Sequence, residues 1–285
     1  MTQGSTIKSF ARRAVASAAV LGGYCFLIKL LGIHRGARIL CYHGINDRPT
    51  NLHAVCTADF VRQMELVAER FTVISMEQLV ALLRGGKAIP PRAVAVTIDD
   101  GHRDAYTHAY PILTRFGIPA TVFLPVAFIG TGSAEGATSR LPQADFLSWD
   151  QVREMSQGGV DFGSHSLTHV SLTKLTREAA RCQLISSKTR LETEIGKPVT
   201  GFSYPYGTFR DFCRETEQLV AATGYSWAVT VISGVNDQGS DLFALRRTRV
   251  ERDDGLGLFE KALKGALDPW IAMQRLGGLS WRKNR

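Results

Sequence analysis

The chain has 285 residues, 45% of them hydrophobic and 21% charged, a composition typical of a globular protein with one sizeable catalytic domain. Its five cysteines include no Cys-x-x-Cys pair, so they indicate neither a disulfide framework nor a zinc knuckle, and we interpret most of them as packing residues. The net charge of +8 admits anionic partners, but the basic residues are spread along the chain without a nucleic-acid-binding motif, so we expect no nucleic acid partner.

The first 35 residues form a basic and apolar segment. Lys8, Arg12 and Arg13 precede an uncharged run at 14–28, which is typical of a signal sequence or an uncleaved anchor. We favour an anchor because no convincing cleavage site follows, although the run is shorter than the roughly 20 residues that span a bilayer comfortably. An ordinary packed helix is the alternative. We therefore expect membrane association through this segment, at the cell envelope on the periplasmic side of the inner membrane.

Between the two ends of the chain, short apolar runs alternate with amphipathic stretches, the pattern of a parallel sheet wrapped by helices. Strands are predicted at 38–42, 71–74, 93–98, 120–124, 160–162, 201–204, 226–230 and 245–250. Helices are predicted at 59–70, 76–84, 105–116, 148–157, 177–195 and 210–223, and Ser148 with Gln151 makes a capping box. The catalytic domain is predicted to span 36–268, followed at 269–285 by a basic amphipathic tail that could lie on a membrane surface.

Two pairs of polar residues each follow a predicted strand. Asp99 and Asp100 lie in the segment Thr-Ile-Asp-Asp-Gly at 97–101, and His165 and His169 follow the strand at 160–162. Taken alone, Asp-Asp-Gly is also a common turn, and two histidines four residues apart can simply share a helix face. Because barrel active sites are built where strands end, one carboxylate and two imidazoles could hold a borderline divalent metal while the other carboxylate serves as a base.

With these motifs in view, the chain resembles the polysaccharide deacetylase family, carbohydrate esterase family four, from about residue 39 to residue 250. The first family motif falls at 97–101, the second at 165–169 and the third, Tyr-Pro-Tyr-Gly, at 204–207; segments 111–113, 119–124 and 147–150 also match. The resemblance implies an α/β fold, a distorted (β/α) barrel, whose metal hydrolyses an N-acetyl group from an amino sugar to give a free amine and acetate.

The resemblance also implies roles for the matching residues. Asp100, His165 and His169 would be the metal ligands, and Asp99 would be the base that takes a proton from the attacking water. The backbone amide of Tyr206 would join the metal in the oxyanion site. The Pro-Tyr-Gly sequence around Tyr206 is also simply a good turn.

The chain departs from the family pattern in two ways. Many members place an arginine two residues before the proline of the third motif, where this chain has Ser203. We expect Arg247, on a late strand, to orient Asp99 instead, with a surface arginine as the alternative. The family commonly takes its general acid from a late histidine, but no histidine follows His169 here.

His43 is the candidate for the missing general acid. It follows the strand at 38–42 and should face the same end of the barrel as the metal ligands. The Tyr42–His43 pair resembles the start of a deacetylase subgroup that lacks the late histidine. Imidazole is also well suited to donate a proton near neutral pH. His102, where the family usually has an aromatic residue, is the competitor, and a lone histidine is often structural.

We therefore predict a metal-dependent carbohydrate N-deacetylase, preceded by an N-terminal hydrophobic helix, that acts on an N-acetylated glycan or glycolipid. Zinc is the expected metal, and cobalt, nickel or iron would also suit mixed histidine and carboxylate ligands. A lipid-linked sugar deformylase is one alternative. Another is a non-catalytic glycan-binding barrel, against which the retention of Asp99 beside a complete ligand set argues.

Overall fold

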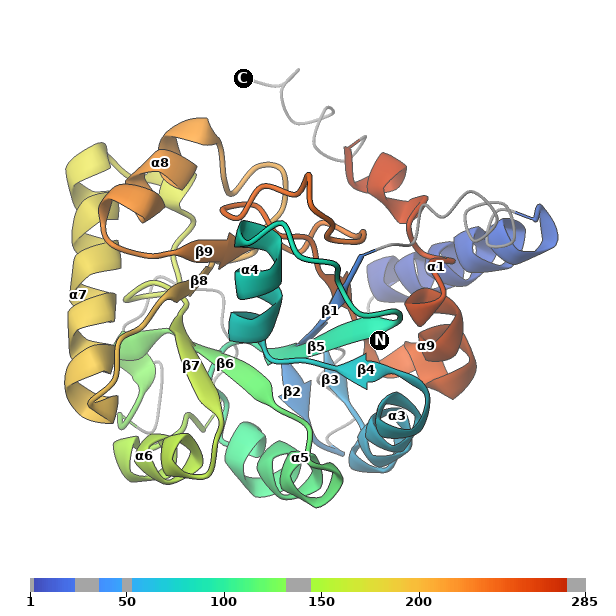
Figure 1. Cartoon of the computed structure of the whole chain (residues 1–285), viewed down its shortest axis with the longest axis horizontal. Helices are drawn as coiled ribbons and strands as arrows, with labels where there is room; N and C mark the ends of the chain where they lie inside the picture. The colour runs from blue at the N-terminus through green and yellow to red at the C-terminus, as the bar shows by residue number, and fades with distance from the viewer. Residues whose placement is uncertain (1–2, 24–35, 48–52, 132–144, 276–285) are drawn as a thin grey trace.

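The computed structural model describes residues 3–23, 36–47, 53–131 and 145–275, and a curled parallel sheet forms its centre (Figure 1). The sheet runs in the order β10-β1-β5-β6-β7-β8-β9, with β4 paired to β5. Its strands are β1 (Arg38–Tyr42), β4 (Thr72–Val73), β5 (Ala93–Ile98), β6 (Ala120–Leu124), β7 (Asp161–Ser164), β8 (Gly201–Ser203), β9 (Trp227–Val229) and β10 (Thr248–Arg249). The short strands β2 (Gly44–Ile45) and β3 (Ala54–Val55) pair with each other beside it.

Helices cover this sheet: most lie around its outside, and the helix at 76–84 lies within its curve, where Leu79 clusters with Ala95 and Phe123 (Figure 1). They are α3 (Thr57–Arg70), α4 (Met76–Arg84), α5 (Tyr110–Phe116), α6 (Trp149–Gln157), α7 (Arg177–Ile195), α8 (Arg214–Ala222) and α9 (Gly255–Leu263). Leu245 extends the sheet beyond β9, because its N–H donates to the Ala228 oxygen and its own oxygen accepts from Thr230. Three residues later the same segment enters β10, which pairs with β1. The predicted distorted (β/α) barrel is therefore the observed architecture.

The central strands consist mostly of apolar residues because both of their faces are covered. All residues of β1, β5 and β6 are buried, as expected for parallel strands with side chains packed above and below them. The predicted bounds of these three strands and of α4 and α7 agree with the structure. The predicted capping box of α6 is also present, since Gln151 N–H donates to Ser148 Oγ and Ser148 N–H donates to Gln151 Oε1.

Three predicted elements differ from the structure by more than two residues. The helix predicted at 210–223 begins only at Arg214. The helix predicted at 105–116 divides into a π-helical stretch, Ala105–Ala109, and α5. Pro111 has no N–H to donate, so the regular hydrogen-bond ladder is interrupted there and the turn before it widens. The strand predicted at 245–250 is regular only at Thr248–Arg249, and α9 was not predicted.

The N-terminal helix α1 (Gln3–Leu21) packs against α9. Its Ala16 and Ala19 lie in one buried cluster with Leu258, Ala262, Ala266 and Leu267. Within the described ranges, no helix has both the length and the apolar character needed to cross a membrane. Residues 24–28, the end of the apolar run in the predicted anchor, lie outside the described residues, as do 276–285 of the predicted tail.

Candidate active site

The site forms where the strands of the sheet end, and backbone hydrogen bonds fix its first residues. Asp99 follows β5, and its N–H donates to the Tyr42 oxygen of β1 over 2.8 Å. His165 follows β7, and its N–H donates to the Leu124 oxygen of β6 over 2.8 Å. The sheet ladder thus continues one residue past the strands and holds both residues at the same end of the barrel.

Asp100, His165 and His169, the three predicted metal ligands, meet at this end of the barrel. Asp100 Oδ1 lies 3.5 Å from His165 Nε2 and 3.3 Å from His169 Nε2. One ligand atom from each of the three residues lies within 4.8 Å of the others, and all three side chains are buried. This spacing allows all three to contact one ion.

The chemistry of this set fits a cation. His165 Nδ1 lies 2.7 Å from the Ser203 backbone oxygen, which can only accept a hydrogen bond, so Nδ1 carries a proton and Nε2 faces Asp100. Asp100 Oδ1 is buried without a hydrogen-bond partner among the described residues. Burial alone would raise the pKa of Asp100, but the two imidazoles hold that pKa well below its usual range. A buried carboxylate facing two ring nitrogens is the donor set of a zinc-class metal site.

The predicted base, Asp99, is paired with Arg247. The guanidinium Nη1 donates to Asp99 Oδ1 over 2.8 Å and Nη2 donates to Oδ2 over 2.6 Å, in a fully buried bidentate pair. Burial would raise the pKa of Asp99, but Arg247 and His165 together lower it to about 2. Asp99 is therefore ionised at neutral pH.

Arg247 is itself held by three further contacts. Its Nε donates to the Thr230 oxygen, Nη1 donates to Thr97 Oγ1, and Nη2 donates to Ser203 Oγ, which in turn donates to Asp99. Ser203, which stands where many family members have an arginine, thus takes part in fixing Arg247, the arginine that this chain supplies from the segment just before β10. The contact between Arg247 and Asp99 that the sequence analysis required is present; its catalytic role remains a prediction.

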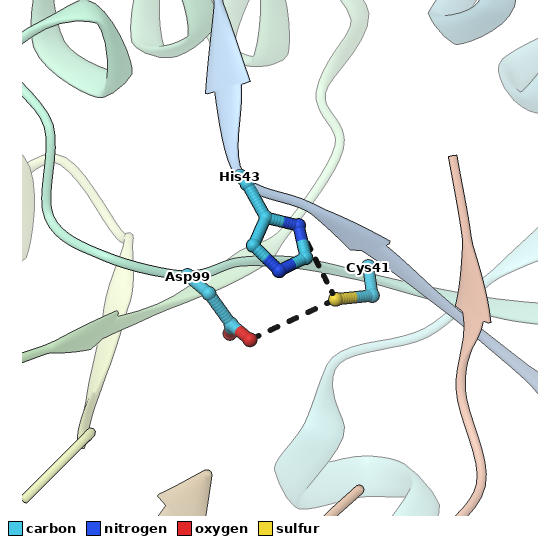
Figure 2. A group of neighbouring side chains, drawn as sticks. All are labelled: Cys41, His43 and Asp99. Carbon is cyan, nitrogen blue, oxygen red and sulfur yellow. Dashed lines mark hydrogen bonds between the residues drawn. The ribbon is translucent and has the colours of Figure 1, made fainter. Parts of the chain in front are cut away.

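His43 and Cys41 lie beside Asp99 (Figure 2). Cys41 Sγ donates to Asp99 Oδ2 over 3.7 Å and lies 4.0 Å from His43 Nδ1. Burial and the neighbouring Arg249 lower the pKa of His43 to about 3, so its imidazole is uncharged at neutral pH. Most of the cysteines were predicted to be packing residues, whereas Cys41 contacts the predicted base.

His102 and Tyr206 line the metal-ligand set from two other directions. His102 Nε2 lies 3.7 Å from Asp100 Oδ2, and its ring stacks on Phe146. His102 is therefore placed next to a predicted ligand. The Tyr206 ring meets the His169 ring edge to face at 4.9 Å. Gly207 follows in a left-handed conformation, where a Cβ would lie 2.9 Å from the Val231 nitrogen, so the turn that presents the Tyr206 amide needs glycine.

Backbone strain gathers at this site. Asp100, Ser166, His169 and Tyr206 have φ values between 54° and 73°, and only one other non-glycine residue in the described part of the chain has positive φ. Each such conformation costs on the order of 1–3 kcal/mol and persists where surrounding structure enforces it. The residue types at these four positions did not allow their left-handed conformations to be predicted from the sequence.

Gln183 of α7 is a site residue that the sequence analysis missed. Its Oε1 accepts from the N–H groups of Leu167 and Thr168, each over 3.0 Å, and its Nε2 donates to Thr168 Oγ1. The side chain therefore fixes the loop between His165 and His169. The only signal in the sequence was a glutamine on the helix predicted at 177–195.

A buried carboxylate and two imidazoles, beside a second carboxylate paired with arginine at the strand ends of a barrel, define a metal-dependent hydrolase. Residues 86–228, half of the chain, match the family described as Polysaccharide deacetylase. The chain therefore belongs to the polysaccharide deacetylase family, carbohydrate esterase family four, and is a hydrolase of the carbohydrate N-deacetylase type.

Individual relatives agree with this assignment. YxkH of Bacillus subtilis (strain 168), itself named for the polysaccharide deacetylase family, is 28% identical over 213 residues, 74% of this chain and 70% of the relative. The poly-beta-1,6-N-acetyl-D-glucosamine N-deacetylase of Escherichia coli (strain K12) is 30% identical over 265 residues, 81% of this chain. The matched region is 39% of that protein's length.

Solved structures share the fold. The Streptococcus pyogenes deacetylase PplD, in complex with acetate, superposes with a TM-score of 0.70 at 23% identity, covering 80% of this chain and 98% of that one. IcaB from Ammonifex degensii superposes with a TM-score of 0.69 at 22% identity, covering 81% and 97%. These likenesses show a common barrel architecture.

Proposed function

We propose that this chain removes N-acetyl groups from an N-acetylglucosamine polysaccharide, with Asp100, His165 and His169 holding the metal and Asp99 acting as the base. The observation that carries the proposal is the ionised Asp99, bound on both oxygens by Arg247 directly beside the ligand set. Glycan binding alone needs no such base. The names of the matched Escherichia coli and Staphylococcus epidermidis relatives, poly-beta-1,6-N-acetyl-D-glucosamine N-deacetylases, support the substrate class.

The proposed chemistry replaces the amide C–N bond with a C–O bond to water. When bound, the metal would polarise the amide carbonyl and acidify the attacking water. Asp99 would accept the water's proton, and the Tyr206 amide would donate to the oxygen that becomes negative. The departing amine must gain a proton. His43 is uncharged before the reaction, so it must first gain a proton. This proton would come from Asp99, and His43 would then deliver it to the amine.

We propose zinc as the resident metal. Two imidazoles and one carboxylate are a common catalytic zinc set, and the same donors would also accept cobalt, nickel or iron. Metal content of the purified chain by elemental analysis, followed by chelation and reloading with each ion, tests this assignment. Activity restored by another ion in preference to zinc would contradict it.

The test of function uses the full chain, because α1 packs on the barrel. Zinc-loaded protein is mixed with β-1,6-linked N-acetylglucosamine oligomers or with chitooligosaccharides, and acetate and free amine are measured. We expect acetate release that Asp99→Asn lowers at least about a thousandfold without loss of the metal. The matched control is Asp161→Asn, a half-buried carboxylate at the amino end of β7, which should keep activity.

Two results would overturn the proposal. Absence of acetate release from all of these oligomers by metal-loaded protein would refute an N-acetylglucosamine polysaccharide as its substrate. Release of formate from a formylated lipid-linked sugar, without acetate release from the oligomers, would instead support the deformylase alternative.

We further propose that the chain associates with the periplasmic side of the inner membrane through its N-terminal segment. Support comes from the apolar run at 14–28 and from Phe10 and Leu21 of α1, whose side chains are exposed. Membrane fractionation of the full chain, followed by carbonate extraction, tests this. Recovery of the chain only in the soluble fraction would contradict it.

A further inference from the structure

Cys41, His43 and Asp99 form a second group of metal-binding side chains next to the first. Cys41 lies in β1, His43 follows that strand, and Asp99 follows the neighbouring β5 (Figure 2). One donor atom from each of the three residues lies within 4.8 Å of the others. Within the described residues this is the one other group, besides Asp100, His165 and His169, that combines such donors at this spacing.

The spacing suits a tetrahedral ion. Zinc binds sulfur at about 2.3 Å and nitrogen or oxygen at about 2.0 Å, so two ligands on one tetrahedral zinc lie roughly 3.5 Å apart. Cys41 Sγ lies 3.7 Å from Asp99 Oδ2 and 4.0 Å from His43 Nδ1. All three donors lie within 4.8 Å of one another, so a small adjustment of the side chains would bring them onto one ion.

We propose that Cys41, His43 and Asp99 form an inhibitory site for a second, thiophilic divalent cation, zinc or cadmium. The inhibition, though not the binding, rests on the proposed function, because it assumes that Asp99 is the base and His43 the acid. An ion bound there occupies an oxygen of the base and a nitrogen of the acid at once. Binding displaces the thiol proton to solvent, since the thiolate is the ligand form of cysteine.

The second site binds more weakly than the first. Asp99 Oδ2 already accepts from Arg247 and Ser203, and the guanidinium charge opposes a cation, whereas Asp100 Oδ1 is buried without such a partner. The thiol of Cys41 is also wholly buried, whereas His43 is half-buried. The first equivalent of metal therefore activates the enzyme and a further amount inhibits it.

Ligand softness sets the order of inhibitors. A site with one thiolate favours cadmium and zinc over manganese and magnesium, which prefer oxygen ligands. Excess cadmium or zinc should therefore inhibit at concentrations at which manganese and magnesium do not.

The experiment titrates the metal-stripped full chain with zinc or cadmium. Bound metal is measured by equilibrium dialysis and acetate release in parallel, and the cadmium–thiolate absorption band reports sulfur ligation directly. We expect two bound ions, a rise and then a fall in activity, and a thiolate band that appears only with the second ion. In Cys41→Ser, the second ion and the band should disappear, and the inhibitory concentration should rise at least about tenfold.

The matched control is Cys182→Ser, which removes an exposed cysteine of α7 and should behave as the wild type. His43→Asn should also lose the second ion, and it provides the test if Cys41→Ser does not fold. Binding of one ion by the wild type, or a thiolate band that survives Cys41→Ser, would overturn the proposal. Two bound ions without any acetate release would refute the deacetylase function and leave the second metal site standing.

Discussion

Asp99 and Asp100 are adjacent in the sequence but have different environments. Asp99 faces Arg247 and Ser203, whereas the left-handed conformation of Asp100 turns its carboxylate towards His165 and His169. Both pKa values are lowered in spite of burial, one mainly by a guanidinium and the other by imidazoles. The left-handed conformation of Asp100 thus directs two adjacent carboxylates to different partners, so that one is placed as the predicted base and the other as a predicted metal ligand.

Replacing Arg247 with lysine should impair catalysis without emptying the metal site. Lysine keeps the charge but cannot bind both oxygens of Asp99 in parallel, so the carboxylate loses its fixed orientation. We expect kcat to fall roughly a hundredfold with unchanged metal content, measured by acetate release and elemental analysis. Arg246→Lys, at the exposed neighbouring position, is the control and should leave kcat unchanged. A full-activity Arg247→Lys variant would remove Arg247 from the base-orienting role.

The contribution of Asp99 to the free energy of unfolding should decrease at acidic pH. Its pKa is lowered from 3.8 to about 2 in the folded protein, so its contribution is complete above pH 4 and is lost as the pH falls towards 2. In metal-free protein, the gap in unfolding free energy between wild type and Asp99→Asn should shrink by about 1 kcal/mol between pH 5 and pH 3.

Asp161 provides a control of opposite sign for this measurement. Burial raises its pKa, so its folded form gains protons more readily and the protein gains stability there as pH falls. In urea unfolding, the difference in unfolding free energy between wild type and Asp161→Asn should therefore shift in favour of the wild type as the pH falls from 5 to 3. A constant gap for Asp99→Asn would show that the Arg247 pair does not depress the pKa of Asp99.

The identities of the site residues were largely readable from the sequence, and their surroundings were not. The histidine spacing and the paired aspartates after strands predicted the group that the fold assembles. The thiol of Cys41 beside the base was not predicted, because its contact with Asp99 depends on the register between β1 and β5. Such contacts between distant segments leave no local pattern in the sequence.

At the scale of elements, α7 is both a barrel helix and the support of the second motif. Its Leu184 packs in the core while the preceding residue, Gln183, accepts two backbone hydrogen bonds from the loop between the histidines. The left-handed conformations of Ser166 and His169 lie on either side of those bonds. The helix therefore holds a strained loop in place.

Replacing Gln183 with alanine should weaken metal binding. The loop loses its partner for two N–H groups, so the relative position of His165 and His169 is less restricted. We expect zinc affinity to fall about 10- to 100-fold in a competition titration against a chromophoric chelator. Arg181→Ala, on the exposed side of the same helix, should leave the affinity unchanged. Equal affinities for both variants would show that the loop is held by other contacts.

Elements with strong periodicity were predictable, and those decided by tertiary contacts were not. β5 has six apolar or β-branched residues between turns, so its bounds followed from composition alone. β10 is only two residues long because its neighbourhood also supplies Arg247 to the site and pairs Leu245 with β9. The sequence pattern at 245–250 does not indicate which of these residues form the regular strand.

At the scale of the whole molecule, a buried ion pair holds α1 on the barrel in addition to the contacts of Ala16 and Ala19. Arg12 Nη2 donates to Asp254 Oδ2 over 2.7 Å and to the Arg249 oxygen over 3.0 Å, with the arginine side chain 3% exposed. Arg12 therefore contacts β10 through Arg249, and Arg247 directly precedes this strand in the chain.

Replacing Arg12 with methionine should release α1. Removing one partner of a buried ion pair leaves Asp254 as an uncompensated charge, at a cost of about 3 kcal/mol. We expect trypsin to cleave after Arg13 roughly a hundredfold faster, followed by mass spectrometry under native conditions. Arg62→Met, an exposed residue of α3, should not change the rate. Unchanged cleavage in Arg12→Met would show that the alanine contacts alone hold the helix.

The pairing of Arg247 with Asp99 joins residues separated by 148 positions. During synthesis, the three candidate ligands, the last of which is His169, leave the ribosome long before Arg247 does. A nascent chain could therefore acquire a cation while Asp99, the predicted base, still lacked the guanidinium. Hydrolytic activity would then appear only after the segment that carries Arg247 has been synthesised and has joined the sheet.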